Sequence, residues 1–470
     1  MKDHVSSVRR SVVKILTTSD APDYEQPWQT QGTVSANGSG SIVSTERGLR
    51  VLTNAHVVEN RVFVEARCFG KARKFVAEVE GVGHECDLAL LTIEDERFFE
   101  GCTPIQLGPL PVLGEEVSVL GYPIGGDRLS ITQGVVSRIE MSHYAQSQRR
   151  LLAVQIDAAI NAGNSGGPVI RDDKLVGVAF QALDEGQNIG YMIGAPVVQH
   201  FLEDMENGSF DGFPDLGICV QPLESNAHRA LLELPKKPRH GVLVTNTVYG
   251  GSSWGKLFRG DVLIQVAECP VAYDGSVRFR RGERIDHGHI VAQRHVGETI
   301  DVKVLRDRKE IKVQIPLCPP RYLVARNRYD VKPTYYIVGG LLFVPLTRDY
   351  LKTWGEDWWE QAPHALVALY ESGIPSEDLR EVVVLQKVLA DRVNVGYHDW
   401  ESFAVTAVGD VKIACLKDMI TAVETCDEQF LRLTMSDGDE LVLDREQAFK
   451  RGKAILSRFG VPADRSDDLV

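Results

Sequence analysis

The sequence contains no long uninterrupted hydrophobic run. Its most apolar stretch, residues 335–346, is interrupted by two glycines and is shorter than the roughly 20 residues that a membrane-spanning helix requires. The N-terminal residues carry charges but no apolar block followed by a small-residue cleavage site, which a secretory signal would show. We therefore expect no integral membrane segment and a cytoplasmic location. The alternative is an organelle interior, reached after removal of a transit peptide.

Paired cysteine motifs are absent as well. The eight cysteines are scattered, and no two of them form a Cys-x-x-Cys pair. This spacing argues against a disulfide framework and against a zinc site, so we expect reduced, mostly buried thiols and no metal. The cysteines lie at positions 68, 86, 102, 219, 269, 318, 415 and 426.

Positive charge is not in excess, and a phosphate-binding loop is missing. The 470 residues include 65 Asp+Glu against 52 Lys+Arg, which gives a formal net charge of −13. Because a nucleic-acid binder needs a basic face to neutralise phosphates, no nucleic-acid partner is expected. No Gly-x-x-x-x-Gly-Lys-Ser loop occurs, so the chemistry is expected to be independent of ATP and to need no cofactor.

The sequence does contain many short β-prone runs separated by glycines, and they fill the first 205 residues. This spacing favours an all-β barrel or sandwich, with a first helix expected at residues 196–205 because that segment begins with proline and ends before Asn-Gly. Turn-rich residues 207–214 and a Cys-Pro-Pro sequence at 318 mark later boundaries. The expected parts are an N-terminal segment at 1–30 and domains at 31–206, 207–318 and 319–470.

One serine lies between flexible glycines, in the string Asp157–Ile170 (DAAINAGNSGGPVI). Glycines allow backbone N–H groups to approach a developing oxyanion without a Cβ in the way. We therefore place an oxyanion hole at Gly163, Asn164 and Ser165, with the N–H groups of Gly163 and Ser165 as the expected donors. A structural serine in a glycine turn is the alternative.

A serine hydroxyl needs a positioned base, and the base needs a third group to orient it. His56 ends a strand-like run in Leu-Thr-Asn-Ala-His-Val-Val, and Asp87 stands just before an apolar run, Leu-Ala-Leu-Leu. Partial burial there would enforce a hydrogen bond between the two. Taken singly, a core histidine and a strand-flanking acid are the alternatives.

Together, TNAHVV, DLALL and GNSGGP in this order resemble the HtrA/Deg family of trypsin-like serine proteases. The segment Gly339–Thr347 (GGLLFVPLT) is similar to the plant-type members with two PDZ domains. The resemblance implies a mainly β fold, with a chymotrypsin-like double β-barrel followed by two α+β PDZ-like domains. It makes Ser165 the nucleophile, His56 the general base and acid, and Asp87 the orienting carboxylate.

The resemblance also implies binding sites for peptides. It places the specificity pocket at Ala159, flanked by Ile160, and no carboxylate is present there to pair with Lys or Arg. We therefore predict cleavage after small or medium aliphatic residues. PDZ domains add an extended peptide to a sheet edge, and the carboxylate-binding loop of the first unit is predicted at Leu216, Gly217 and Ile218. Residues 339–342 resemble that loop in the second unit, which departs more from a usual PDZ domain and whose alternative role is assembly.

The resemblance implies an ATP-independent serine endopeptidase that degrades unfolded or damaged proteins in quality control, regulated by PDZ-mediated peptide binding. The alternatives are a peptide-binding scaffold and a chaperone, each with a resting or incidental protease activity. Tyr24 and Trp28 resemble aromatic residues that hold the family's trimers together. We therefore expect a homo-oligomer, a trimer or a multiple of trimers, with intrachain packing as the other interpretation of these two residues.

Overall fold

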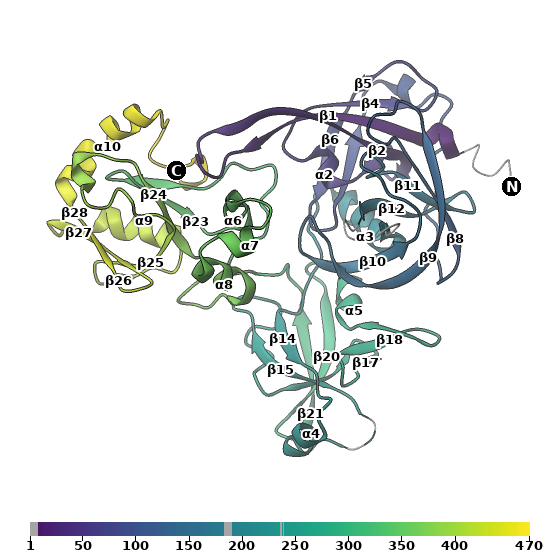
Figure 1. Cartoon of the computed structure of the whole chain (residues 1–470). Coiled ribbons are helices and arrows are strands. Elements are labelled where there is room, and N and C mark those ends of the chain that lie inside the picture. Colours follow the sequence, from purple (N-terminus) through teal and green to yellow (C-terminus); the bar gives the residue numbers. More distant parts are fainter. Residues whose placement is uncertain (1–7, 183–189, 236, 238) are drawn as a thin grey trace. The chain divides into compact units, whose positions relative to one another are not determined.

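The structure of the chain is a computed structural model that describes residues 8–182, 190–235, 237 and 239–470 (Figure 1). The backbone divides into two compact units. The first contains the residues up to Ser19 together with residues 33–320, and the second contains residues 20–32 and 321–470. None of the helices among the described residues combines the length and the apolar content that a membrane crossing requires.

The first sheet of the first unit carries the segments that bear His56 and Asp87. Its seven strands lie in the order β5-β4-β1-β2-β3-β7-β6. Four of the five residues of β7 are buried, which explains why this strand has a continuous apolar sequence. The elements are β1 (Val12–Pro22), β2 (Thr30–Thr45), β3 (Gly48–Thr53), α2 (Ala55–Val58), β4 (Arg61–Cys68), β5 (Phe75–Val76), β6 (Glu78–Gly83), β7 (Leu88–Thr92) and the short 3₁₀ helices η1 (Arg9–Ser11) and η2 (Glu96–Phe98).

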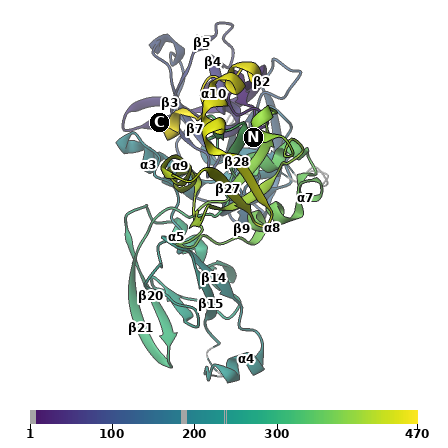
Figure 2. The ribbon, with the colours of Figure 1, turned by 90° about the vertical axis from the view of Figure 1, so that its left-hand side faces the viewer.

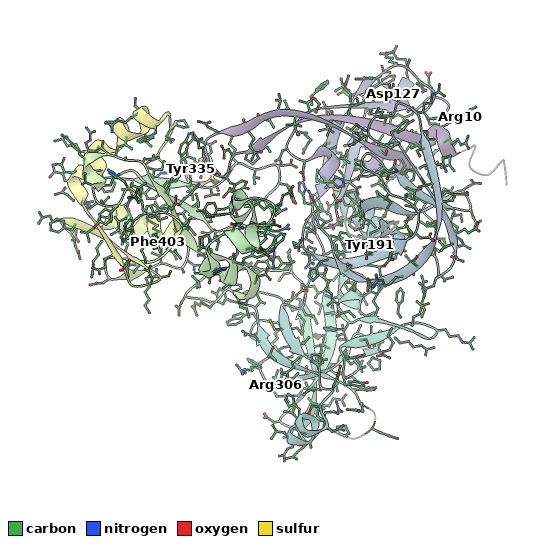
Figure 3. The ribbon with its side chains drawn as sticks, viewed as in Figure 1. Arg10, Asp127, Tyr191, Arg306, Tyr335 and Phe403 are labelled. Carbon is green, nitrogen blue, oxygen red and sulfur yellow. The ribbon has the colours of Figure 1, made fainter. Side chains whose placement is uncertain are left out.

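A closed six-stranded barrel follows, in the order β10-β13-β12-β11-β8-β9. Val154 and Ile156, two residues apart on β10, belong to its core, and Tyr191 on β13 is also buried (Figure 3). Helix α3 (Ala195–Asp204) ends this part, at the position predicted for the first helix. The strands are β8 (Glu116–Gly121), β9 (Ser130–His143), β10 (Arg150–Ile156), β11 (Pro168–Arg171), β12 (Lys174–Ala182) and β13 (Gly190–Gly194); η3 (Met205–Asn207) follows α3.

A smaller sheet with two short helices completes the first unit. Its strand order is β14-β15-β16-β20-β21, with β17 paired to β16 and a separate β18-β19 hairpin. β20 and β21 form a long antiparallel pair (Figure 2), whereas β14 is an edge strand. The elements are β14 (Ile218–Gln221), α4 (Asn226–Leu231), β15 (Val242–Thr247), β16 (Val262–Val266), β17 (Cys269–Pro270), β18 (Ser276–Arg280), β19 (Glu283–Asp286), α5 (Gly288–Ala292), β20 (Thr299–Arg306) and β21 (Lys309–Pro316).

The second unit is built on a seven-stranded sheet with a hydrophobic core on each face. The strand order is β22-β23-β24-β25-β27-β28, with β26 paired to β25. Along β23, Phe343 packs in one core and Leu342 and Val344 pack in the other, so this strand is apolar throughout. The strands are β22 (Tyr336–Val338), β23 (Leu341–Pro345), β24 (Val383–Val388), β25 (Phe403–Val408), β26 (Val411–Lys412), β27 (Phe430–Met435) and β28 (Glu440–Asp444).

Helices pack on both sides of this second-unit sheet. Residues of α9 belong to the same core as Phe343, and residues of α6, α7 and α8 belong to the core that contains Tyr335; Tyr335 and Phe403 are labelled in Figure 3. The helices are α6 (Arg348–Leu351), α7 (Trp358–Gln361), α8 (His364–Ser372), α9 (Leu416–Thr425), α10 (Arg445–Phe459), η4 (Lys352–Trp354), η5 (Arg392–Asn394) and η6 (Asp467–Leu469).

Tyr24 and Trp28 pack within the second unit. The Trp28 ring meets the ring of Tyr335 edge-on, with 5.8 Å between centroids. The hydroxyl of Tyr24 donates to the carbonyl of Arg328 at 3.3 Å, and Nε2 of Gln386 donates to the carbonyl of Tyr24 at 2.9 Å. This arrangement is the intrachain alternative to the subunit contact predicted for these aromatic residues. β1, moreover, makes residues 12–22 part of the first sheet rather than of a separate N-terminal segment.

Candidate active site

His56 and Asp87 form a hydrogen-bonded pair at one end of the first sheet. His56 lies in α2, directly after β3, and Asp87 lies in the turn between β6 and β7. Nδ1 of His56 is 2.8 Å from Oδ2 of Asp87, and the backbone N–H of His56 donates to Oδ1 at 2.9 Å. One carboxylate therefore holds both the ring and the backbone of the histidine, which fixes the orientation of the imidazole.

The backbone of Asp87 adopts the left-handed conformation, with φ at 54°. Non-glycine residues seldom adopt this conformation, although aspartate tolerates it better than most. The Asp87 side chain is 1% exposed, and Nδ2 of Asn54 donates to its carbonyl at 2.7 Å. Backbone strain of this kind is one of the features that cluster at active sites.

The surroundings of His56 raise its pKa. Burial lowers the pKa, but the charge of Asp87, its hydrogen bond and the carboxylate of Glu59 outweigh burial. Glu59 directly follows α2, and burial raises its own pKa to about 7 against the opposing charge of His56. Nε2 of Gln146, from the turn between β9 and β10, donates to Oε2 of Glu59. A raised histidine pKa favours the imidazolium that forms when this side chain accepts a proton.

Ser165 lies in the loop between β10 and β11, against the segment that precedes His56. The N–H of Ser39 donates to the carbonyl of Ser165 at 2.8 Å. A Cβ on Gly166 would stand 3.0 Å from the backbone nitrogen of Asn54, two residues before His56. Among the described residues, the partly exposed Ser165 hydroxyl makes no hydrogen bond. The structure thus brings the serine loop beside the histidine segment without a bond between the two side chains.

The serine loop presents two backbone N–H groups without acceptors. Gly163 has a φ of 95°, and a Cβ there would stand 2.5 Å from the carbonyl oxygen of Tyr122. In the part of the chain that the structure describes, the N–H groups of Gly163 and Ser165 donate to no acceptor. The N–H of Asn164, by contrast, donates to the carbonyl of Asn161 at 2.9 Å. Two of the three residues predicted for the oxyanion hole therefore offer a free donor.

Ser39 organises this loop, and sequence reasoning missed it. Its buried Oγ donates to the carbonyl of Gly163 at 2.7 Å and accepts from the N–H of Tyr122 at 2.8 Å. A Cβ on either neighbouring glycine, Gly38 or Gly40, would stand less than 3.0 Å from other atoms. The tripeptide Gly-Ser-Gly in a β-rich segment was the available signal, because glycine within a strand often marks a close approach.

Ala159 and Ile160 lie early in the loop that carries Ser165 and contribute no charge. Oγ1 of Thr132 donates to the carbonyl of Ala159 at 3.0 Å, and Ile160 is buried. The nearby carboxylate of Asp157 accepts from the backbone N–H of Val135. This carboxylate is therefore already hydrogen-bonded to the backbone of β9.

Leu216, Gly217 and Ile218 lie at the start of the edge strand β14. Gly217 has a φ of 66°, and its N–H donates to Oδ1 of Asp215 at 2.6 Å. Leu216 and Ile218 line a cavity of about 190 Å³, which is also lined by Val291 of α5. A free strand edge beside a hollow is the geometry that strand addition of a peptide requires.

Residues 339–342 of the second unit comprise a tight turn, Gly339 and Gly340, and the first two residues of β23, which pair with β22. The N–H of Leu389 donates to the carbonyl of Gly340 at 2.7 Å, and Nδ2 of Asn394 donates to that of Gly339 at 2.8 Å. β23 pairs with β22 on one side and with β24 on the other. The structure therefore differs from the open carboxylate loop predicted here, because β22 occupies the edge of β23.

Comparison with protein families identifies two domains. A model of the trypsin-like peptidase domain matches residues 38–178, and a model of the PDZ domain matches residues 324–468. The first match contains His56, Asp87 and Ser165.

Curated relatives and solved structures agree with these matches. "Protease Do-like 2, chloroplastic" of Arabidopsis thaliana is 38% identical over 100% of this chain and 77% of its own length. "Protease Do-like 4, mitochondrial" of the same plant is 38% identical over 97% of this chain and 85% of its own. The solved structure "HtrA-type protease AlgW with tripeptide" matches 67% of this chain and 97% of its own, with a TM-score of 0.52 and 25% identity. This chain therefore belongs to the Do-like, or HtrA/Deg, family of serine proteases, with a trypsin-like peptidase domain and a PDZ domain.

Proposed function

We propose that the chain is an ATP-independent endopeptidase of unfolded or damaged proteins and that Ser165, His56 and Asp87 carry its reaction. The observation that carries this proposal is that Asp87 hydrogen-bonds both the ring and the backbone N–H of His56. This pair lies beside the loop of Ser165, which has free N–H donors. A histidine oriented in this way is ready to take a proton from a hydroxyl.

In the first half of the reaction, Ser165 Oγ attacks the carbonyl carbon of the peptide bond while Nε2 of His56 takes the hydroxyl proton. Asp87 stabilises the resulting imidazolium. The N–H groups of Gly163 and Ser165 donate to the oxyanion of the tetrahedral intermediate. When the C–N bond breaks, His56 gives its proton to the departing amine, and an acyl-enzyme remains.

In the second half, His56 takes a proton from water, and the hydroxide attacks the acyl carbon. Collapse of the second tetrahedral intermediate returns the proton to Ser165 and releases the new carboxyl terminus. Because Ser165 and His56 are not hydrogen-bonded in this structure, a small movement of the serine loop on substrate binding is part of the proposal.

The test compares the wild type with Ser165→Ala in casein digestion and in labelling by a fluorophosphonate. We expect both signals to disappear in the variant and to persist in Ser137→Ala, which alters an exposed serine on β9. A wild type that neither cleaves nor labels would favour the scaffold alternative. Suppression of aggregation by the Ser165→Ala protein would add a chaperone activity.

The lack of a carboxylate at Ala159 and Ile160, the positions predicted for the specificity pocket, supports a preference for small or medium aliphatic residues before the cleaved bond. A positively charged side chain would find no carboxylate at these two positions. A panel of fluorogenic peptides that differ only at this residue tests the preference, and better cleavage after arginine than after valine would contradict it.

We propose that peptide capture belongs to residues 207–318, which we interpret as a first PDZ domain. The support is the free edge of β14 beside the cavity at α5. For the domain at residues 324–468 we propose a role in assembly instead, because β22 of the same chain pairs with β23.

The relatives named above are described as chloroplastic or mitochondrial, and they support an organelle interior for this chain. This proposal replaces the cytoplasmic location expected from the sequence. Fractionation of the source cells with an antibody to the chain tests it. The homo-oligomer remains a proposal from the family resemblance, and light scattering after size exclusion measures its size.

A further inference from the structure

Two of the scattered cysteines meet in the first unit. Cys68 ends β4 and is buried, and Cys102 lies in the turn that follows η2 and is partly exposed. Their sulfur atoms are 4.0 Å apart. None of the other six cysteines, all of which are among the described residues, makes a hydrogen bond between sulfurs. The pattern of scattered positions gave no sign of this contact, because 34 residues separate the two cysteines.

We propose that Cys68 and Cys102 form a reversible disulfide, which makes this corner of the protease domain an oxidation site. A disulfide needs a sulfur–sulfur distance of about 2.05 Å, so the two atoms must approach by roughly 2 Å. Cys102 is well placed for this movement, because it lies in a turn outside the helices and strands, closed by the hydrogen bond from its N–H to the carbonyl of Phe99.

The surroundings make Cys102 the attacking thiol. Nζ of Lys71 donates to the carbonyls of Phe98 and Glu100, both at 2.9 Å, and so holds a positive charge beside this turn. The hydrogen bond between the two thiols lowers the pKa of Cys102 most, burial opposes it, and the charges of Lys71 and Arg10 add to the lowering, which brings the pKa to about 7. The lowered pKa increases the thiolate fraction of Cys102, and the thiolate is the form that attacks disulfides.

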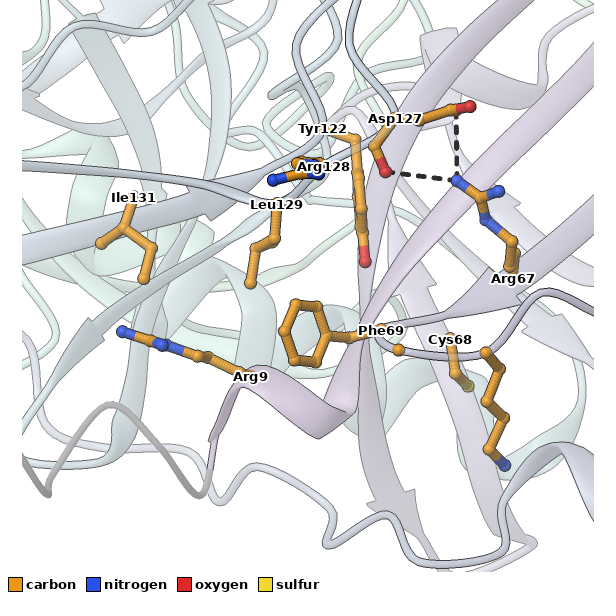
Figure 4. A pocket seen from close by; sticks show the side chains of 11 residues that line it. Arg9, Arg67, Cys68, Phe69, Tyr122, Asp127, Arg128, Leu129 and Ile131 are labelled. Atoms are coloured by element: carbon orange, nitrogen blue, oxygen red, sulfur yellow. Dashed lines mark hydrogen bonds and ion pairs between the residues drawn. The ribbon is translucent and has the colours of Figure 1, made fainter.

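Cys68 is the resolving thiol. Its pKa is raised, first by the hydrogen bond with Cys102 and then by burial. The first of these causes disappears once the sulfur of Cys102 is bonded to another sulfur. Cys68 also lines a cavity of about 530 Å³, next to Phe69 and Tyr122 (Figure 4).

The chemistry requires an oxidant of the small-molecule disulfide class, such as glutathione disulfide. The Cys102 thiolate attacks one sulfur of this oxidant and releases one glutathione thiolate. Cys68 then attacks the sulfur of Cys102, its proton goes to solvent, and the second glutathione leaves. One disulfide is reduced to two thiols while two protein thiols become one disulfide.

The bond would close a loop that contains β5, β6, β7 and Asp87. Cross-linking such a loop restricts the unfolded chain and raises the temperature of unfolding. The disulfide would therefore stabilise the fold of the segment that carries Asp87, without contacting the reacting atoms.

The test exposes the full chain to glutathione disulfide, blocks the remaining thiols with N-ethylmaleimide and maps tryptic peptides by mass spectrometry. We expect one cross-linked species, residues 68–71 joined to residues 98–128, that dithiothreitol removes. Mixed disulfides on Cys102 alone, or no modification, would overturn the proposal.

Thermal inactivation provides the second readout. The oxidised wild type should retain activity to a midpoint roughly 5 °C or more above that of the reduced wild type. This difference should vanish in Cys68→Ser and Cys102→Ser and persist in Cys426→Ser, a partly exposed cysteine of the second unit. Because the peptide map is made on the wild type, it shows whether the disulfide forms even if a variant fails to fold. Equal midpoints of the oxidised and reduced wild type would contradict the proposed effect.

Discussion

Gly166 lies so close to Ser39 that a Cβ on Gly166 would stand 2.2 Å from the Ser39 carbonyl oxygen. The residue also has a φ of 82°, so both its conformation and its surroundings require glycine. This contact holds the loop that carries Ser165 against β2.

Replacing Gly166 by alanine should therefore both destabilise the protease domain and inactivate it. We expect a loss of stability of about 3 kcal/mol or more, because the clash is with backbone. We also expect a fall in kcat/KM of about 100-fold or more, because a displacement of about 1 Å at the reacting groups has that effect. Chemical denaturation and a fluorogenic peptide assay measure the two effects.

Gly114→Ala is the matched control, since Gly114 has a φ of 81° and no atom within 4 Å of its Cβ position. It should lose only about 1 kcal/mol, the cost of the left-handed conformation alone. Equal effects of the two substitutions would show that the contact with Ser39 is unimportant.

Asp87→Asn should lower kcat/KM by about 10³- to 10⁴-fold. Both oxygens of Asp87 accept hydrogen bonds from His56, and an amide can offer only one acceptor, so either the ring or the backbone of the histidine loses its partner. Steady-state kinetics with a fluorogenic peptide measure the effect. Asp172→Asn, in the exposed turn between β11 and β12 of the closed barrel, should leave the rate unchanged. A comparable loss there, or none in Asp87→Asn, would remove Asp87 from the triad.

Glu59→Gln should move the acid limb of the pH profile of kcat/KM to lower pH. His56 acts as a base only when neutral, so kcat/KM falls as the pH drops through the His56 pKa. The charges that raise this pKa come from Asp87 and Glu59, and the substitution removes the second. Around Glu59, the groups that face it are His56, Asp87, His84 and Gln146.

The shift of the acid limb should be a fraction of a pH unit, because burial raises the pKa of Glu59 to about 7 and its charge is incomplete there. Profiles recorded at constant ionic strength measure it, and Glu78→Gln on the exposed side of β6 should show no shift. A shift to higher pH would mean that Glu59 does not act on His56 through its charge.

Asp391→Asn should lower the melting temperature of the second unit by several degrees. The Asp391 side chain is 1% exposed and accepts from Nη2 of Arg451 at 2.6 Å. The hydrogen bond of Arg451, against the opposing effect of burial, lowers the pKa of Asp391 to about 2. Because the folded-state pKa is depressed, the stabilisation is complete above the unfolded-state pKa of about 3.9 and is lost as the pH falls toward 2.

Thermal melts between pH 2 and pH 7 should therefore show a smaller difference between wild type and Asp391→Asn at the acid end. Asp410→Asn is the control, since Asp410 is 92% exposed in its ion pair with Arg432 and such pairs contribute little. A pH-independent difference would argue against ionic stabilisation by Asp391.

Local sequence patterns predicted the contact between His56 and Asp87, because each of the two residues lies in one short motif. His56 and Asp87 flank apolar strands whose burial brings them together, and the glycines around Ser165 require the turn that they form. Contacts between distant segments were not predictable in this way. Cys68 and Cys102 lie 34 residues apart, and the pairing of Gln146 with Glu59 depends on the turn between two barrel strands.

In the second unit, a short sequence motif did not predict the local structure. Residues 339–342 have the small and apolar composition of a carboxylate-binding loop, yet β22 directly before them pairs with β23. The composition of a segment shows which conformations it can adopt, and pairing with a neighbouring strand selects one of them.

The first unit should capture peptides at the β14 edge, and Val220→Glu should weaken this binding. Ile218 and Val220 both line the cavity beside α5, so a glutamate at 220 would replace an apolar side chain of the groove and repel a peptide's terminal carboxylate. Gln221→Glu adds the same charge on an exposed neighbouring residue of the strand and should bind as the wild type does. Fluorescence anisotropy with a labelled peptide that ends in valine, using Ser165→Ala protein to prevent cleavage, measures both affinities. Equal weakening by the two substitutions would point to general electrostatics, and the β14 groove would then not be the peptide site.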